Sequence, residues 1–208
     1  MEQLLCTDYP QAFGLTRRNI LISKITKFDI FDVCDAKACH QCPHECQDNG
    51  ILKVFSDIDV TELDIEEYFK QFQNTRADVS GSRCDKLMYD SHGRRVAFVE
   101  LTCKEVTEER NLLSLDSKRT KAYEQLKNSI DKLKSISSIN GRIDSFSVKS
   151  AIFAYRQNDL ISSLSSVLKD GVSPFIKPMQ LAESHDLSVD MGNGFDFHHI
   201  RYPELLKW

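Results

Sequence analysis

The sequence lacks any long apolar run. A membrane-spanning helix needs about 18 or more consecutive apolar residues, and no stretch of the 208 residues approaches that length. Residues 1–6 place no basic segment ahead of an apolar stretch, so they do not have the form of a signal peptide. We therefore expect a cytoplasmic protein that does not interact with membranes.

The sequence also lacks internal repeats, low-complexity linkers and a large excess of charge of one sign. Its net charge is −4, which argues against a protein whose whole surface attracts nucleic acid. A local basic groove remains compatible with this charge, because charges act over a Debye length of roughly 8–10 Å. The length suits one domain that builds its core without disulfides or other cross-links.

Residue patterning predicts an α/β fold with a mixed central sheet flanked by helices. Runs rich in β-branched and aromatic residues predict strands at 19–33, 51–55, 84–89, 95–103 and 147–155. Apolar residues at helical spacing predict helices at 64–72, 117–140 and 159–169. A strand, helix and strand in this order normally form a right-handed crossover within one sheet.

Three regions follow from this pattern. Residues 1–50 hold N-terminal strands and a segment rich in cysteine and histidine, and residues 51–170 form the core. Residues 171–208 form a tail that we expect to cover the core or to mediate contacts, and its adjacent His198 and His199 should point to opposite faces of a strand.

Two carboxylates flank the hairpin turn expected at residues 90–93. Asp85 precedes this turn and Glu100 follows it at a similar distance, so the two should face each other across the hairpin. Glu100 lies in the apolar run VAFVELTC, where an ionised carboxylate is costly unless something compensates its charge. A divalent cation such as Mg²⁺ would do so. Alternatively, Glu100 pairs with an arginine or lysine, or lies at a solvated end of the sheet.

The order of these elements resembles the PD-(D/E)XK, or restriction-endonuclease-like, nuclease superfamily. The resemblance covers roughly residues 60–156: a helix with an acidic residue, Asp85 in one strand, Glu100 in the next, a long helix and a further strand. It implies a restriction-endonuclease-like core and a metal-dependent nuclease that hydrolyses phosphodiester bonds of DNA or RNA, a class common in bacterial defence. It also implies that Asp85 and Glu100 bind Mg²⁺ or Mn²⁺, with Glu67 or its neighbour Glu66 as the helix carboxylate.

The chain departs from the family motif at one position. The family's lysine is replaced by Thr102, which cannot carry a positive charge. Lys104 lies two residues further on the same face, Lys86 adjoins Asp85, and Gln125 is a polar group on the long helix. One of these could take the lysine's role. Otherwise the site is inactive, and the fold serves as a module that binds a protein or nucleic acid.

The long predicted helix is locally basic. Residues 118–134 carry six lysines and arginines against Glu124 and Asp131. This face could contact a nucleic-acid backbone, or it could simply be solvated.

Four cysteines lie within 13 residues: Cys34, Cys39, Cys42 and Cys46. A cytosolic chain keeps its thiols reduced, so clustered cysteines favour a metal over disulfides. Zinc prefers four sulfur or nitrogen ligands, and His40 or His44 could replace a cysteine. An iron–sulfur cluster is the less favoured alternative. If zinc binding were central, the chain would be a zinc-binding regulatory protein in which the pair Asp85 and Glu100 is incidental.

Overall fold

The computed structural model describes residues 1–15, 19–34, 51–79, 82–106, 112–157, 189–202 and 204–208, without the side chains of 103–106, 112–117 and 156–157. Its helices are α1 (Glu2–Cys6), α2 (Asp8–Ala12), α4 (Ile65–Lys70), α5 (Leu112–Lys134) and α6 (Ser137–Asp144). Its strands are β1 (Lys24–Val33), β2 (Leu52–Asp64), β3 (Lys86–Asp90), β4 (Arg95–Val106), β5 (Val148–Gln157), β6 (Val189–Gly192), β7 (Phe195–Tyr202) and β8 (Leu205–Lys207).

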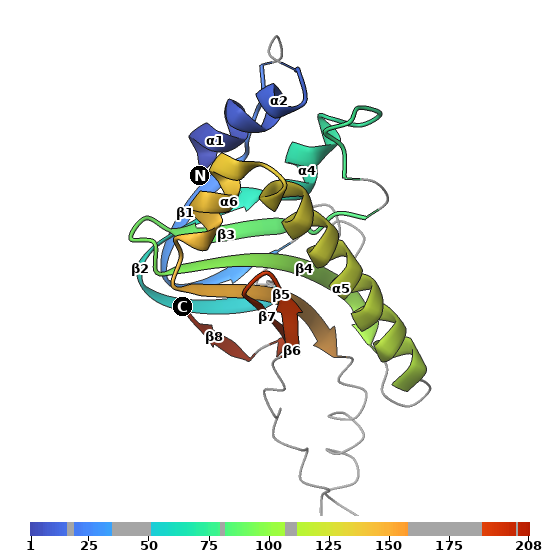
Figure 1. Cartoon of the computed structure of the whole chain (residues 1–208). Coiled ribbons are helices and arrows are strands. Elements are labelled where there is room, and N and C mark those ends of the chain that lie inside the picture. The colour runs from blue at the N-terminus through green and yellow to red at the C-terminus, as the bar shows by residue number, and fades with distance from the viewer. Residues whose placement is uncertain (16–18, 35–50, 80–81, 107–111, 158–188, 203) are drawn as a thin grey trace, which may run out of the picture.

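The strands form one mixed sheet in the order β1-β2-β3-β4-β5-β7-β6, with β8 pairing β2 (Figure 1). β4, β5 and β7 are parallel to one another, whereas β1 to β4 pair antiparallel. The chain between β4 and β5 forms α5 and α6, as the expected crossover requires. The predicted mixed α/β sheet with flanking helices is therefore confirmed at this level.

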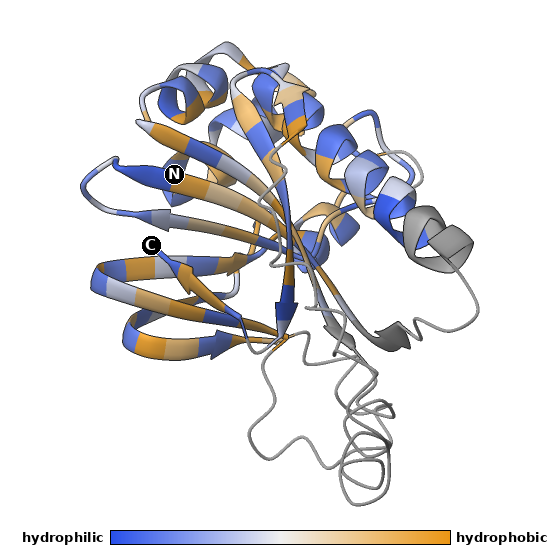
Figure 2. Ribbon diagram, turned by 90° about the horizontal axis from the view of Figure 1, so that it is seen from below, coloured by the Kyte–Doolittle hydropathy of each residue, from blue (hydrophilic) through white to orange (hydrophobic). Residues whose placement is uncertain are grey.

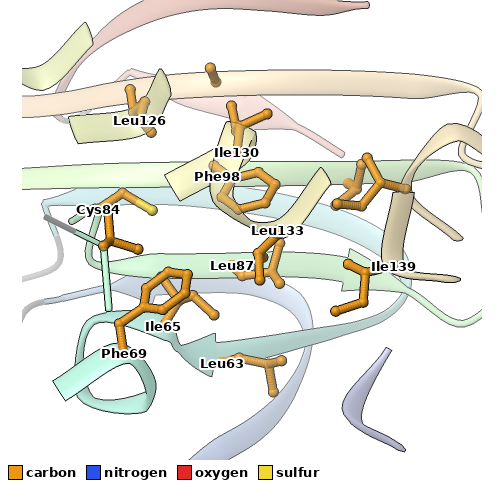
Figure 3. Close-up of a cluster of buried hydrophobic side chains, with 14 of the residues drawn as sticks. Leu63, Ile65, Phe69, Cys84, Leu87, Phe98, Leu126, Ile130, Leu133 and Ile139 are labelled. Carbon is orange, nitrogen blue, oxygen red and sulfur yellow. The ribbon is translucent and has the colours of Figure 1, made fainter. Parts of the chain in front are cut away.

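The helices cover one face of the sheet (Figure 2). On that face, apolar residues of α5 pack onto β3 and β4, where Leu126, Ile130 and Leu133 lie over Phe98 and Leu87 (Figure 3). The other face has a second core made of strand residues, including Val54, Met88, Val99 and Ile152. β4 contributes to both cores, as its unbroken apolar run predicts.

The hairpin between β3 and β4 turns where the sequence predicts. Gly93 has a φ of 73°, which favours glycine, and the Asp90 carboxylate accepts hydrogen bonds from the backbone N–H groups of Arg94 and Arg95. Lys86 pairs with Val99 and Tyr89 with Val96. This register places Asp85, the residue before β3, next to Glu100.

The helix predicted at 117–140 differs from the structure. α5 ends at Lys134, Ile136 is extended (φ −107°, ψ 117°), and a separate helix, α6, begins at Ser137. Gly141, which directly follows the predicted end of this helix, lies inside α6. The break lets α6 direct Ile139 and Ile143 into the helix-face core, and both side chains are fully buried.

The first strand and the C-terminal strands join the same sheet. β1 pairs with β2, while β6 and β7 extend the sheet beyond β5. The segment expected as a covering tail thus supplies strands, because Met191, Phe195 and Phe197 alternate into the helix-face core. No described helix is long and apolar enough to cross a membrane. The helix expected at 159–169 lies outside the described residues.

Candidate metal site

Backbone hydrogen bonds hold Asp85 against β4. Its N–H donates to the Val99 carbonyl at 3.0 Å, and its Oδ2 accepts from the Leu101 N–H at 2.7 Å. These two bonds bracket Glu100, so Asp85 is fixed beside it. The carbonyl of Asp85 also accepts from Ile65 and Glu66 at the start of α4, which ties this helix to the same point.

Glu100 has a buried carboxyl group, and one of its two oxygens accepts no hydrogen bond from the described residues. Its Oε2 is buried and has no hydrogen-bond partner among the described residues. Burial, and secondly the charge of Asp85, raise the pKa of Glu100 to about 10, and the charge of Glu66 acts in the same direction. A hydrogen bond from Gln125 and the charge of Lys121 oppose this rise. Such a group stays protonated at neutral pH unless a cation compensates its charge.

Side-chain alternation places Glu100 on the helix face of the sheet. Phe98, two residues before Glu100, lies in the helix-face core, whereas Val99 and Leu101 lie in the core on the opposite face. Glu100 therefore lies on the face that α5 covers. Asp85 precedes β3, and its Oδ2 is held beside Glu100 by the Leu101 N–H.

Lys86 lies on the face of the sheet opposite to Glu100. Its neighbour on the same face is Met88, and its Nζ contacts Asp64 Oδ2 at 3.1 Å. The Lys86 side chain is only 8% exposed and is held by this ion pair. The proposal that Lys86 replaces the family's lysine is therefore wrong for this arrangement, because successive strand residues point to opposite faces.

Two polar residues of α5 border the pair, one turn apart. Gln125 donates from Nε2 to the Arg83 carbonyl at 2.9 Å and lies near Glu100, as the sequence suggested. Lys121 is exposed, and its charge lowers the Glu100 pKa. The sequence pattern alone marks Lys121 only as one of the basic residues of the long helix. Its spacing of four residues from Gln125 was the pattern that could have placed it at the site.

The carboxylates of α4 are not equivalent. The charge of Glu66 acts on Glu100, while Glu67 has a side chain that is 44% exposed. Both contact Lys70, at 2.6 Å and 3.0 Å. Asp64 caps the helix by accepting from the Glu67 N–H at 2.9 Å. The structure thus shows an electrostatic effect of Glu66 on Glu100, and a ligand role for Glu67 stays a prediction.

The remaining candidates are only partly described. Thr102 is half-buried and lies opposite Tyr155, and Lys104 lies in β4 but its side chain is outside the described residues. Cys34 is half-buried just after β1. Cys39, Cys42, Cys46, His40 and His44 lie outside the described residues. In the described part of the chain, no group of three or more His, Cys, Asp or Glu side chains is arranged to hold a metal ion.

The basic character of α5 divides along its length. In the C-terminal half, Lys127 contacts Asp131 at 2.5 Å and Lys134 contacts Asp144 at 2.6 Å. Lys132 lies over the Phe13 ring, 4.4 Å from its centroid. These lysines have partners within the chain. In the N-terminal half, Lys121 is the residue whose charge acts on Glu100.

No protein-family model, curated protein or solved structure matches this chain. The function of the chain is therefore inferred from the arrangement of its own residues.

Proposed function

We propose that the chain is a metal-dependent nuclease that hydrolyses phosphodiester bonds of nucleic acid. The observation that carries the proposal is the buried Glu100 Oε2, which has no hydrogen-bond partner among the described residues and lies beside a second carboxylate. Leaving a buried polar atom uncompensated costs about 1–3 kcal/mol. A fold that keeps such an atom next to Asp85 is suited to a cation that the two carboxylates share.

The residues fit Mg²⁺ or Mn²⁺. Such hard cations take oxygen ligands, often one or two carboxylates, with water and substrate phosphate completing the coordination. Asp85 and Glu100 would hold the ion. When bound, the cation would activate a water molecule and neutralise charge on the phosphate. The Leu101 N–H orients Asp85, and Gln125 bridges Glu100 to the loop before β3 through the Arg83 carbonyl.

Lys121 is the residue that we propose in place of the lysine missing at Thr102. It lies on the helix face and acts electrostatically on Glu100. Its exposed side chain can reach a phosphate bound at the pair, and an ammonium there would stabilise the developing negative charge. Lys121 would thus position the substrate and stabilise charge without occupying the motif position.

The test measures cleavage of single- and double-stranded DNA and RNA with Mn²⁺ or Mg²⁺ and with chelator. We expect metal-dependent cleavage that Glu100→Gln abolishes and that Glu124→Gln, an exposed substitution on α5, preserves. Calorimetric titration with Mn²⁺ alone should show binding that Glu100→Gln weakens. Metal binding without cleavage of any substrate would favour the alternative, an inactive nuclease-fold module. Absence of both would refute the proposal.

The role of Lys121 predicts a second result. Lys121→Gln should lower kcat about 10²-fold, which is the usual scale for a positioned catalytic group. Lys121→Arg should restore part of the activity because it keeps the charge. Lys127→Gln removes the same charge from the same helix at a residue paired with Asp131, so it should have little effect. Equal losses in Lys121→Gln and Lys127→Gln would show that α5 acts only through its total charge.

A further inference from the structure

A hollow of about 340 Å³ lies on the opposite flank of α5 from the carboxylate pair. The described residues that line it are Arg119, Thr120, Tyr123, Val189 and Phe197. They come from α5, β6 and β7, and we call this site the α5–β7 hollow. It opens to solvent at Val189, which is 49% exposed.

The base of the hollow is aromatic. Tyr123 and Phe197 contact each other edge to face, with ring centroids 5.4 Å apart and an interplanar angle of 81°. Phe197 is 4% exposed and belongs to the core, whereas Tyr123 is only partly buried. The pair therefore offers an accessible ring on a rigid support, which suits stacking of a planar aromatic ligand.

One side of the hollow is cationic. Arg119 Nη2 lies 3.2 Å from His199 Nδ1. A guanidinium has no acceptor, so Nδ1 accepts this bond and the proton of a neutral His199 ring lies on Nε2. In the described part of the chain, no carboxylate forms an ion pair with Arg119. A guanidinium placed in this way suits bidentate binding of a phosphate.

Strand register explains why His199 lies on the helix face, where it contacts Arg119. His199 pairs with Phe153, which in turn pairs with Glu100, and both of these lie on the helix face. His198 pairs with Ile152 of the opposite core. Alternation also turns Asp190 and Asp196 away from the helix face, because they flank residues of that core. Asp190 and Asp196 therefore do not point toward the hollow, where their charges would repel a bound anion.

We propose that the α5–β7 hollow is a nucleotide-binding site, in which the base stacks on Tyr123 and the phosphate binds Arg119 beside His199. The volume accommodates one nucleotide, and the aromatic base and the cationic side match its two chemical parts. The ligand could be a free nucleotide or one unit of a nucleic-acid single strand. This site shares no lining residue with the carboxylate pair, so the proposal does not depend on nuclease activity.

Binding is measured in chelator, so that no cleavage occurs, with two probes: adenosine 5′-monophosphate by calorimetry and a fluorescein-labelled 12-nucleotide DNA single strand by anisotropy. Arg119→Gln should weaken binding about tenfold or more, the usual cost of removing a charge-assisted hydrogen bond. Tyr123→Leu should weaken it about fivefold to tenfold through lost stacking. Tyr123→Phe keeps the ring and should retain affinity. It can be measured even if Tyr123→Leu does not fold.

Matched controls come from the chain itself. Arg142→Gln removes the same charge on α6, and His198→Ala removes the histidine on the other face, so both should bind nucleotide like the unsubstituted protein. His199→Ala should weaken binding. Similar affinity for the two probes identifies a free nucleotide as the ligand, and a strand that binds at least about tenfold more tightly identifies nucleic acid. The proposal is overturned if neither probe binds at millimolar concentration, or if Arg119→Gln and Arg142→Gln bind alike. Glu100→Gln should bind normally, which separates this result from the nuclease proposal.

Discussion

Burial disfavours ionisation of the Glu100 carboxyl group, and this makes the stability of the folded chain depend on pH. The pKa of Glu100 is raised to about 10 in the folded chain, from an ordinary value of 4.5. Without metal, Glu100 ionises above about pH 4.5 in the unfolded chain but stays protonated in the folded chain until the pH approaches 10. This group therefore lowers stability progressively as pH rises from about 4.5 toward the folded pKa.

We expect Glu100→Gln to be more stable than the unsubstituted protein at pH 8 in chelator, by at least about 1.4 kcal/mol, the equivalent of one pKa unit. At pH 4 the difference should shrink, because Glu100 is then protonated in both states. Urea unfolding at the two pH values measures this. Added Mn²⁺ should raise the Tm of the unsubstituted protein and leave that of Glu100→Gln nearly unchanged. A stability difference independent of pH would contradict a buried, protonated Glu100.

The hairpin made the carboxylate pair predictable from sequence. Once the turn at 90–93 is recognised, strand register alone sets Asp85 beside Glu100, and the structure shows that register. Neighbours from other elements were not predictable in this way. Lys86 adjoins Asp85 in sequence but faces the opposite core, and Lys121 approaches from α5 because of how the helix is rotated on the sheet, which only tertiary packing determines.

At the scale of secondary-structure elements, α4 depends on one residue with two functions. Asp64 accepts from the Glu67 N–H through Oδ1 and contacts the buried Lys86 through Oδ2. A lost N-cap costs about 1 kcal/mol, and breaking a buried ion pair costs roughly 3–5 kcal/mol. The first residues of α4 donate hydrogen bonds to the Asp85 carbonyl. A substitution of Asp64 should therefore also disturb the carboxylate pair.

Asp64→Ala should therefore lower the free energy of unfolding by about 3 kcal/mol or more, since it leaves Lys86 buried without its partner. Asp64→Asn keeps the cap and removes the charge, so the difference between the two variants isolates the cap. Asp64→Ala in a Lys86→Met background should recover most of the loss. Urea unfolding of all three variants tests this, and a loss below 1 kcal/mol in Asp64→Ala would show that Lys86 finds another partner.

Element boundaries show where sequence patterns stop being sufficient. The cap at Asp64 and the apolar run of β4 are local patterns, and both elements form where predicted. The break between α5 and α6 has no comparable marker. Ile136 leaves the helix between Ser135 and Ser137, and Asn140 and Gly141 continue a helix that they normally end. Burial of Ile139 and Ile143 supplies the energy for this change of direction.

At the scale of the whole molecule, the sheet joins parts of the chain that are far apart in sequence. β7 pairs with β5, and β8 pairs with β2 along the edge opposite to β1. Short patterns could not show this, because the aromatic residues of 195–202 fit a covering segment as well as a strand. Which strand β7 or β8 pairs with depends on how the other strands are arranged, and the paired residues lie far apart in the sequence. The C-terminal strands should therefore contribute to global stability.

Phe195 tests this contribution. It is fully buried and contacts the Phe98 ring edge to face at 5.6 Å. Phe195→Ala should lower the free energy of unfolding by about 3–5 kcal/mol, as expected for a large aromatic residue removed from a core. Phe28→Ala in β1 is the matched control, because Phe28 is 59% exposed and its loss should cost about 0.5 kcal/mol or less. Urea unfolding followed by circular dichroism compares the two. If both variants lose equally little, residues 195–202 act as a peripheral contact segment, and the α5–β7 hollow would lose its rigid support.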